Sequence, residues 1–162
     1  MPVRPILAYP DPRLRQPAAL VTEFDDALRA LAADLVDTLH DAQAFGITAP
    51  HVGVLLQLMV IRLDEASSAR IYVNPRIVSA SAETARHEEG SVSMPGLTEK
   101  LERPARIRVA YQDLDGKQHT EDAEGLLAVC HQHEIDQLAG IFWLDRLSRL
   151  KRERLLKRYS KR

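Results

Sequence analysis

Residues 133–137, with the sequence His-Glu-Ile-Asp-Gln, differ at one position from H-E-x-x-H, a helical motif that presents two zinc-binding histidines one turn apart. His133 and Glu134 match the motif, whereas Gln137 stands where the second histidine would be. The neutral amide oxygen of glutamine is a weaker ligand for first-row metals than imidazole is. The stretch therefore indicates a metallohydrolase, an altered metallohydrolase or the remnant of one.

A helix over residues 122–138 would position these side chains. By the 3.6-residue helical period, one face of it carries Leu126, Val129, Cys130, His133 and Gln137. This face is apolar for two turns and then polar, so we predict that His133 and Gln137 reach the floor of a pocket at the edge of the core, with Glu134 beside them. A core histidine with satisfied hydrogen bonds is the alternative interpretation. His131 would point away from this face, and Cys130 would be a small buried hydrophobic side chain.

The rest of the chain predicts a mixture of helices and short strands. Apolar residues at helical spacing predict a helix over residues 24–44, and a further helix is expected over residues 147–159. Strands are predicted over residues 54–63, 70–73, 77–82 and 107–112, with Asn74-Pro75 ending the second of them. Asp115-Gly116 predicts a hairpin turn between residues 107–112 and 117–120. We therefore expect a single α+β domain over residues 1–162, with short antiparallel or mixed strands around the motif-bearing helix and a helix at the C-terminus.

Composition and cysteine content narrow the class of protein. The 162 residues are 45% hydrophobic and 28% charged, which is typical of a globular domain. Cys130 is the only cysteine, so an intramolecular disulfide is excluded and a reducing compartment fits. The N-terminus has no apolar segment of signal-peptide length, and no apolar run approaches the ~20 residues that span a bilayer. We expect a cytoplasmic protein without a membrane partner.

Charge is distributed unevenly along the chain. Residues 146–162 contain nine Lys or Arg and one acid, Glu153, whereas the remainder carries thirteen bases and twenty-two acids. One interpretation is a solvated helix that packs through Leu147, Leu150 and Leu155. The other is a basic arm for an anionic partner such as RNA or the ribosome. No feature indicates DNA binding.

Three stretches, in this order along the chain, resemble the motifs of the peptide deformylase family. Residues 46–53 (Gly-Ile-Thr-Ala-Pro-His-Val-Gly) resemble G-L-A-A-x-Q-V-G, and residues 88–96 (Glu-Glu-Gly-Ser-Val-Ser-Met-Pro-Gly) resemble the segment around E-G-C-L-S. Residues 125–138 resemble the third motif, which contains H-E-x-x-H. Residues 9–15 and 145–148 are similar as well, so the resemblance covers essentially the whole chain. Three ordered motifs are far more specific than one, and the chain is identified as a member of this family.

The resemblance implies a peptide deformylase-like fold and a hydrolase that removes the N-formyl group from the initiator methionine. In the family, one cysteine and two histidines hold a divalent ion, usually ferrous iron. By position, Glu134 would be the general base and His133 one metal ligand. Ser91 and Gln137 fall on the other two ligand positions. His51 replaces a glutamine that would stabilise the oxyanion together with the backbone N–H of Val92, and Gly46 belongs to the same substrate and oxyanion region.

The exchanged ligand positions put the metal-dependent reaction in question. A serine hydroxyl stays protonated near neutral pH and binds such metals poorly, so we expect no metal or only a weakly bound divalent ion such as iron or zinc. One alternative is a rearranged site in which His51 and His133 bind the metal with help from Gln137 or Glu134. Another is a metal-free pair of His51 and Glu134 that activates water. The third is drift after loss of activity.

A protein can keep the residues that bind its substrate when the residues that hold the metal are replaced. The resemblance implies that Phe45, Leu126, Val129 and Cys130 line an apolar pocket for methionine, although core packing would explain the same residues. Family members often carry an arginine seven residues after the metal-binding cysteine, but this position holds Thr98 and the nearest arginine is Arg103. Three functions follow. The chain is a deformylase-like protein with absent or strongly reduced activity, an active amide hydrolase with a rearranged site, or a non-catalytic binder of N-terminal Met peptides or the ribosome.

Overall fold

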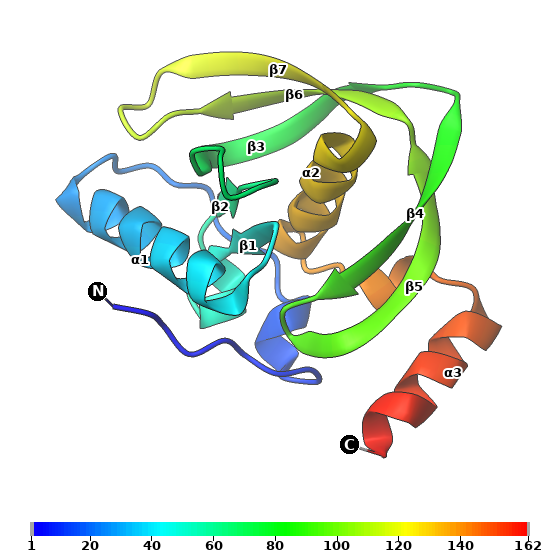
Figure 1. Cartoon of the computed structure of the whole chain (residues 1–162). Helices are drawn as coiled ribbons and strands as arrows, with labels where there is room; N and C mark the ends of the chain where they lie inside the picture. Colours follow the sequence, from blue (N-terminus) through cyan, green and yellow to red (C-terminus); the bar gives the residue numbers. More distant parts are fainter. Residues whose placement is uncertain (1, 162) are drawn as a thin grey trace.

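A computed structural model describes residues 2–161 and confirms the α+β class (Figure 1). The helices are α1 (Asp26–Ala42), α2 (Gly125–Leu138) and α3 (Arg149–Ser160), with short 3-10 turns η1 (Pro12–Arg15), η2 (Ala49–Val52) and η3 (Trp143–Arg146). The strands are β1 (Gly46–Thr48), β2 (Leu58–Ile61), β3 (Arg70–Ala80), β4 (Thr84–Ser91), β5 (Met94–Pro104), β6 (Arg106–Gln112) and β7 (Gln118–Glu124).

The strands form two antiparallel sheets on either side of α2. One sheet has five strands in the order β1-β2-β3-β6-β7, and the other is the hairpin β4-β5. In Figure 1, α2 lies between the larger sheet and this hairpin, and it contacts strands of both. The motif-bearing helix is therefore central, as the sequence predicts.

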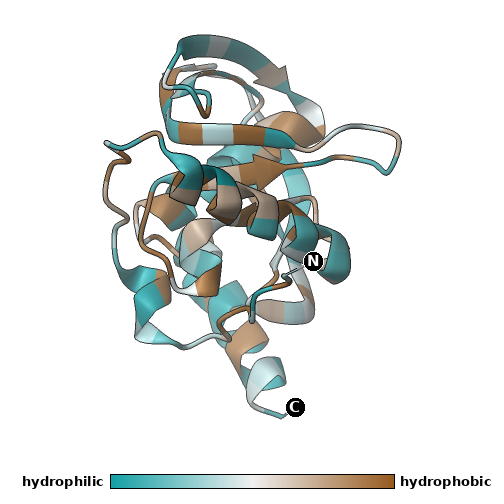
Figure 2. Ribbon diagram, turned by 90° about the vertical axis from the view of Figure 1, so that its left-hand side faces the viewer, coloured by the Kyte–Doolittle hydropathy of each residue, from teal (hydrophilic) through white to brown (hydrophobic). Residues whose placement is uncertain are grey.

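The core explains why α1 and the sheet adopt this arrangement. Helix α1 begins at the N-cap Asp25, whose carboxylate accepts from the N–H of Leu28, and its leucine face packs on β1 and β2. All four residues of β2 are buried, which is why it reads as a continuous apolar run rather than an alternating one. Figure 2, in which α1 lies toward the viewer, shows hydrophilic residues along the outer side of this helix.

Two predicted element boundaries are wrong for identifiable reasons. Asn74-Pro75 does not end a strand, because Asn74 adopts a left-handed φ of 49° and its side chain exchanges two hydrogen bonds with the backbone of Val21. The strand continues through an irregularity to Ala80, which joins the two strands predicted at 70–73 and 77–82. Helix α2 begins at Gly125 rather than at Asp122, because residues 122–124 pair with β6 as the end of β7.

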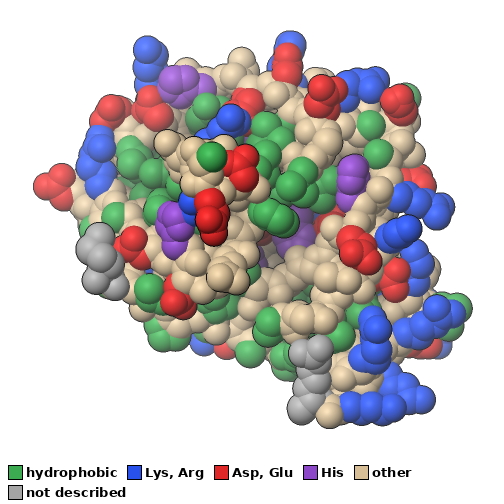
Figure 3. All heavy atoms as spheres, viewed as in Figure 1, with side chains coloured by type: hydrophobic (Ala, Val, Ile, Leu, Met, Phe, Trp, Pro, Cys, Tyr) green, Lys and Arg blue, Asp and Glu red, His purple; other side chains and the backbone are tan. Residues whose placement is uncertain are grey.

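The C-terminal helix packs differently from the prediction. Leu147 and Leu155 are buried against β5 and the segment around Phe142, but Leu150 is 58% exposed and does not belong to the packing stripe. Tyr159 takes part instead, donating a hydrogen bond from its hydroxyl to the carbonyl of Tyr9. Most of the basic side chains of α3 face solvent, and Figure 3 shows Lys and Arg gathered over this helix.

The hairpin of β4 and β5 is missing from the predicted strands. Its residues alternate between exposed charges and few buried apolar side chains, notably Leu97 and Leu101, so the apolar signal is weak. The hairpin nevertheless carries Glu89 and Ser91 to the side of α2 that bears His133. None of the helices among residues 2–161 is both long and apolar enough to cross a membrane.

Candidate active site

A cavity of about 340 Å³ lies where α2, the segment entering β1 and the β4-β5 hairpin meet. Figure 3 shows this face hollowed near its centre, with histidine and acidic side chains at the bottom of the hollow. Eight residues singled out from the sequence line the cavity: Phe45, Gly46, His51, Ser91, Val92, Leu126, Val129 and Cys130. His133 and Glu134 line it as well, so the three motifs converge on one site.

The apolar residues lie on the walls and at the mouth. Phe45 is 52% and Leu126 is 40% exposed, which places both at the rim. Val129 and Cys130 are buried beneath them on α2. Burial raises the pKa of the Cys130 thiol to about 12, with the nearby carboxylates of Glu134 and Glu89 acting in the same direction, so the thiol stays protonated at neutral pH.

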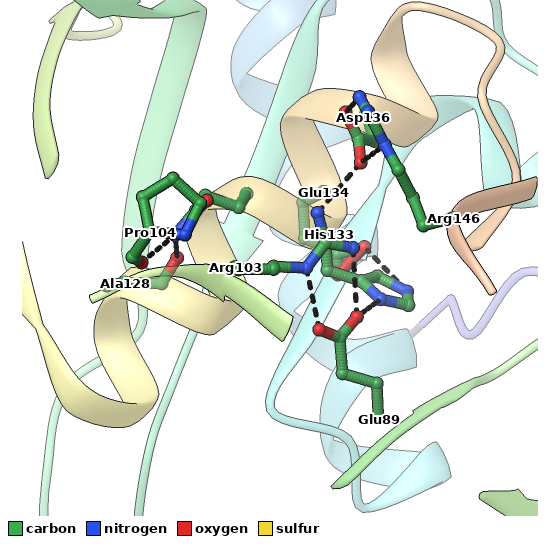
Figure 4. Close-up of polar contacts among 9 residues, drawn as sticks. Glu89, Arg103, Pro104, Ala128, His133, Glu134, Asp136 and Arg146 are labelled. Carbon is green, nitrogen blue, oxygen red and sulfur yellow. Dashed lines mark hydrogen bonds and ion pairs between the residues drawn. The ribbon is translucent and has the colours of Figure 1, made fainter. Parts of the chain in front are cut away.

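His133 is held by a buried chain of charged groups. Its Nδ1 lies 2.9 Å from Oε1 of Glu89, and Arg103 donates to both oxygens of the same carboxylate at 2.6 and 3.0 Å (Figure 4). Arg103 also donates to Asp136 at 2.9 Å, and Asp136 accepts two further bonds from Arg146. Because Glu89 accepts at Nδ1, that nitrogen carries the proton and Nε2 is left for the cavity.

The carboxylates govern protonation around His133. Burial disfavours its imidazolium, but Glu134 and Glu89 outweigh that effect and raise the pKa of His133. Burial likewise opposes ionisation of Glu89, but the hydrogen bonds from His133 and Arg103 lower its pKa. Arg103 is thus engaged inside the protein with its side chain 7% exposed, and it does not replace the arginine missing at Thr98.

Glu134 occupies the space that the absence of a side chain at Gly46 leaves open. Its side chain is 5% exposed, and burial raises its pKa despite the attraction of His133. A Cβ atom at Gly46 would lie 2.6 Å from Oε2 of Glu134, well inside van der Waals contact. The opposite oxygen, Oε1, is buried without a hydrogen-bond partner among the described residues and lies 4.0 Å from Nε2 of His133.

His51 faces the cavity with one tautomer fixed by its own loop. Its Nδ1 accepts the backbone N–H of Thr48 at 3.0 Å and lies 2.9 Å from the hydroxyl of Thr48, within a capping box at the start of η2. Burial, followed by the charge of His133, lowers the pKa of His51 to about 3, so the ring is neutral. A neutral ring that accepts at Nδ1 carries its proton on Nε2, which is buried and unpaired within residues 2–161.

The comparisons with known proteins agree with this geometry. The family model described as polypeptide deformylase matches residues 3–153. The chain belongs to the polypeptide deformylase family. A relative from Brucella melitensis biotype 1 named peptide deformylase-like is 62% identical over 99% of this chain and 98% of its own length. A peptide deformylase from Afipia carboxidovorans is 44% identical over 99% and 96% of the two chains. The crystal structure of a peptide deformylase from Legionella pneumophila superposes with a TM-score of 0.93 at 40% identity, covering 98% of this chain and 94% of that one.

Deformylases use a divalent metal, and the residues at this chain's ligand positions fit such an ion poorly. The helical period predicts that Gln137 lines the cavity, and this prediction is wrong. Gln137 is buried, and its Nε2 donates to the carbonyl of Leu14 at 2.7 Å. The hydroxyl of Ser91 accepts the N–H of Ser93 at 3.0 Å. Within residues 2–161, no three His, Cys, Asp or Glu side chains are arranged to hold a metal ion. The tautomer of His51 also places a proton on the nitrogen that a rearranged metal site would need.

Sequence reasoning missed three members of the deformylase site: Glu89, Arg103 and Asp136. Glu89 stands in the second motif, two residues before Ser91, and this spacing on a strand was the available signal for a shared face. The contacts of Arg103 depend on the β4-β5 pairing, which no local pattern predicted. His131, as predicted, points away from the cavity, and its Nε2 lies 2.9 Å from Glu121.

Proposed function

We propose that this deformylase-family protein binds the N-terminal Met segment of peptides in its cavity without carrying out ordinary metal-dependent deformylation. The observation that carries the proposal is the donor set at the three ligand positions. His133 offers Nε2, but Ser91 offers a neutral hydroxyl, and Gln137, which could coordinate only through its amide oxygen, does not line the cavity and is bonded to the carbonyl of Leu14. One strong donor does not hold a divalent iron or zinc ion against water.

The names of the relatives support the proposal. Proteins 54–62% identical to this chain bear the name peptide deformylase-like, whereas those at 40–44% bear the name peptide deformylase. The apolar rim and wall of the cavity are retained in this chain, as is the glycine that makes room for Glu134. The apolar rim and wall support recognition of an apolar N-terminal side chain.

An active hydrolase with a rearranged site is the competing function. Coordination by His51 would require Nε2 to lose its proton and Nδ1 to gain one, which would break the hydrogen bond from the Thr48 backbone. As a donor, however, the Nε2–H of His51 offers what the side-chain amide of the family's glutamine offers, a hydrogen bond to a carbonyl oxygen.

Metal content and turnover measured on one preparation test the proposal. Protein produced with added iron, zinc or nickel should contain much less than one metal per chain and should not deformylate a formyl-Met peptide. Calorimetric titration with formyl-Met and Met peptides should still show binding, and Phe45→Ser should weaken it. One metal per chain together with turnover at ~1–10³ per second would overturn the proposal.

We also propose that α3 contacts an anionic partner such as ribosomal RNA. Arg149, Arg154, Lys157 and Arg158 are all exposed on this helix, and Glu153 is its one acidic residue. Sedimentation with purified ribosomes should show binding that weakens as salt rises and is lost in the variant R154E/K157E/R158E. The control reverses two exposed arginines on β6, Arg106 and Arg108, which pair with Glu83 and Asp122, and should bind as the parent does. Equal binding by both variants would contradict the proposal.

A further inference from the structure

Three side chains at the cavity have the chemistry of a nucleophile, a base and an orienting carboxylate. Glu89 and Ser91 lie two residues apart at the end of β4, and Glu89 holds Nδ1 of His133 at 2.9 Å. Ser91 and His133 both line the cavity. A carboxylate that fixes the Nδ1–H tautomer leaves Nε2 as an acceptor, which is the arrangement that activates a serine hydroxyl in acyl transfer.

The hydroxyl of Ser91 has its proton available. It accepts the backbone N–H of Ser93 at 3.0 Å, which uses a lone pair and keeps the rotamer in place. No hydrogen bond joins Ser91 to His133 among the described residues. Such a contact between nucleophile and base is often long in a ligand-free site and tightens when substrate is bound.

Three neighbouring side chains could stabilise charge or hold the base in place during acyl transfer. Nε2–H of His51 is buried, unpaired within the described chain and at the cavity wall, so it can donate to a carbonyl oxygen that gains charge. The carboxylate of Glu134, 4.0 Å from Nε2 of His133, would stabilise the imidazolium that forms after proton transfer. Arg103 holds Glu89 in place through two hydrogen bonds.

We propose that Ser91 is the nucleophile of a metal-free acyl-transfer site for short acyl esters. The proposal rests on the proposed function, because Ser91 and His133 are free to react only where no metal occupies them. The Ser91 Oγ–carbon bond forms as His133 Nε2 takes the hydroxyl proton. The carbon–oxygen bond to the leaving alcohol then breaks, and that alcohol takes the proton from His133. Water attacks the acyl-serine, gives a proton to His133, and releases a carboxylic acid as Ser91 regains its proton.

The test uses the full-length protein, stripped of metal with EDTA, and p-nitrophenyl acetate as the probe. We expect release of about one p-nitrophenolate per chain in a burst and an acetyl adduct that peptide mapping places on Ser91. Ser91→Ala should abolish the adduct. Ser93→Ala is the matched control, because the hydroxyl of Ser93 is buried, unpaired within the described residues and away from the cavity lining, and it should react as the parent does. His133→Asn should slow adduct formation at least ~100-fold, the lower limit for loss of a general base.

The outcomes separate this inference from the proposed function. An adduct on Cys130 or on surface lysines, or an unchanged burst in Ser91→Ala, overturns the serine nucleophile, as does the absence of any adduct. Each of these results leaves the proposed function intact when the untreated protein holds no metal. EDTA-sensitive hydrolysis of formyl-Met peptides overturns the proposed function instead, and this inference with it.

Discussion

The two halves of the cavity differ in how completely their polar groups are paired. On one side, His133, Glu89, Arg103 and Asp136 form a continuous set of short hydrogen bonds. On the other side, Nε2 of His51 and Oε1 of Glu134 are buried without hydrogen-bond partners among the described residues, and Oε1 has only the longer contact of 4.0 Å with His133. The exchanged positions lie in all three motifs, with His51 in the first, Ser91 in the second and Gln137 in the third. The hydrogen bonds that orient His133 are thus present although Ser91 and Gln137 stand at the other two ligand positions, so support and coordination are separable parts of one site.

Restoring both ligand types would produce the largest change and would break the contrast between the halves. The variant S91C/Q137H should bind zinc or iron at least ~10²-fold more tightly than the parent, if each ligand contributes about 1.4–3 kcal/mol. Metal content after dialysis against a graded chelator measures this change. The single variants are the controls and should each gain less; no gain in the double variant would mean that the ligand positions have moved apart.

Removing the central cation would disrupt the paired half. Arg103→Met leaves Glu89 buried and short of two donors, so we expect a loss of about 3–5 kcal/mol in the free energy of unfolding by urea. The matched control is Arg108→Met, which breaks the exposed pair with Asp122 and should cost less than ~1 kcal/mol. Similar losses in the two variants would show that the buried network contributes no more to the free energy of unfolding than an exposed ion pair does.

Acidification probes the unpaired half through His51. Folding lowers the pKa of this imidazole from the ordinary histidine value of 6.5 to about 3, so the unfolded chain binds the extra proton between these values. The contribution of His51 to stability is therefore fully present above pH 6.5 and is lost as the pH falls toward 3. Between pH 7 and 5 it amounts to about 2 kcal/mol. The unfolding free energy of His51→Gln should fall by that much less than the parent's over the same interval, and parallel curves would contradict the neutral buried ring.

The smallest expected change in stability comes from the contact between Gly46 and Glu134. Gly46→Ala places a methyl group 2.6 Å from Oε2 of Glu134 and should destabilise the protein by about 1–2 kcal/mol, because the carboxylate must move. Peptide binding, measured by calorimetry, should weaken as well. Gly116→Ala is a control in the turn between β6 and β7, outside the cavity lining, where the cost comes mainly from the positive φ and peptide binding should not change.

Local patterns predicted the helices and much of the site, and failed where long-range contacts decide. Leucine spacing located α1 and α3, and Asp115-Gly116 located the β6-β7 turn. The strand irregularity at Asn74 depends on hydrogen bonds with Val21, fifty-three residues away, which no window contains. The same holds for the contact between Gln137 and the carbonyl of Leu14. The helical period alone predicts Gln137 in the cavity. Its amide instead donates to the buried carbonyl of Leu14, because a buried carbonyl without a hydrogen bond is costly.

The close approach of Gly46 and Glu134 also limits how this family of sequences can diverge. A side chain at position 46 forces the Glu134 carboxylate to move, so substitutions at the two positions are not independent. A homologue that carries alanine or a larger residue at the first site should carry a shorter residue at the second.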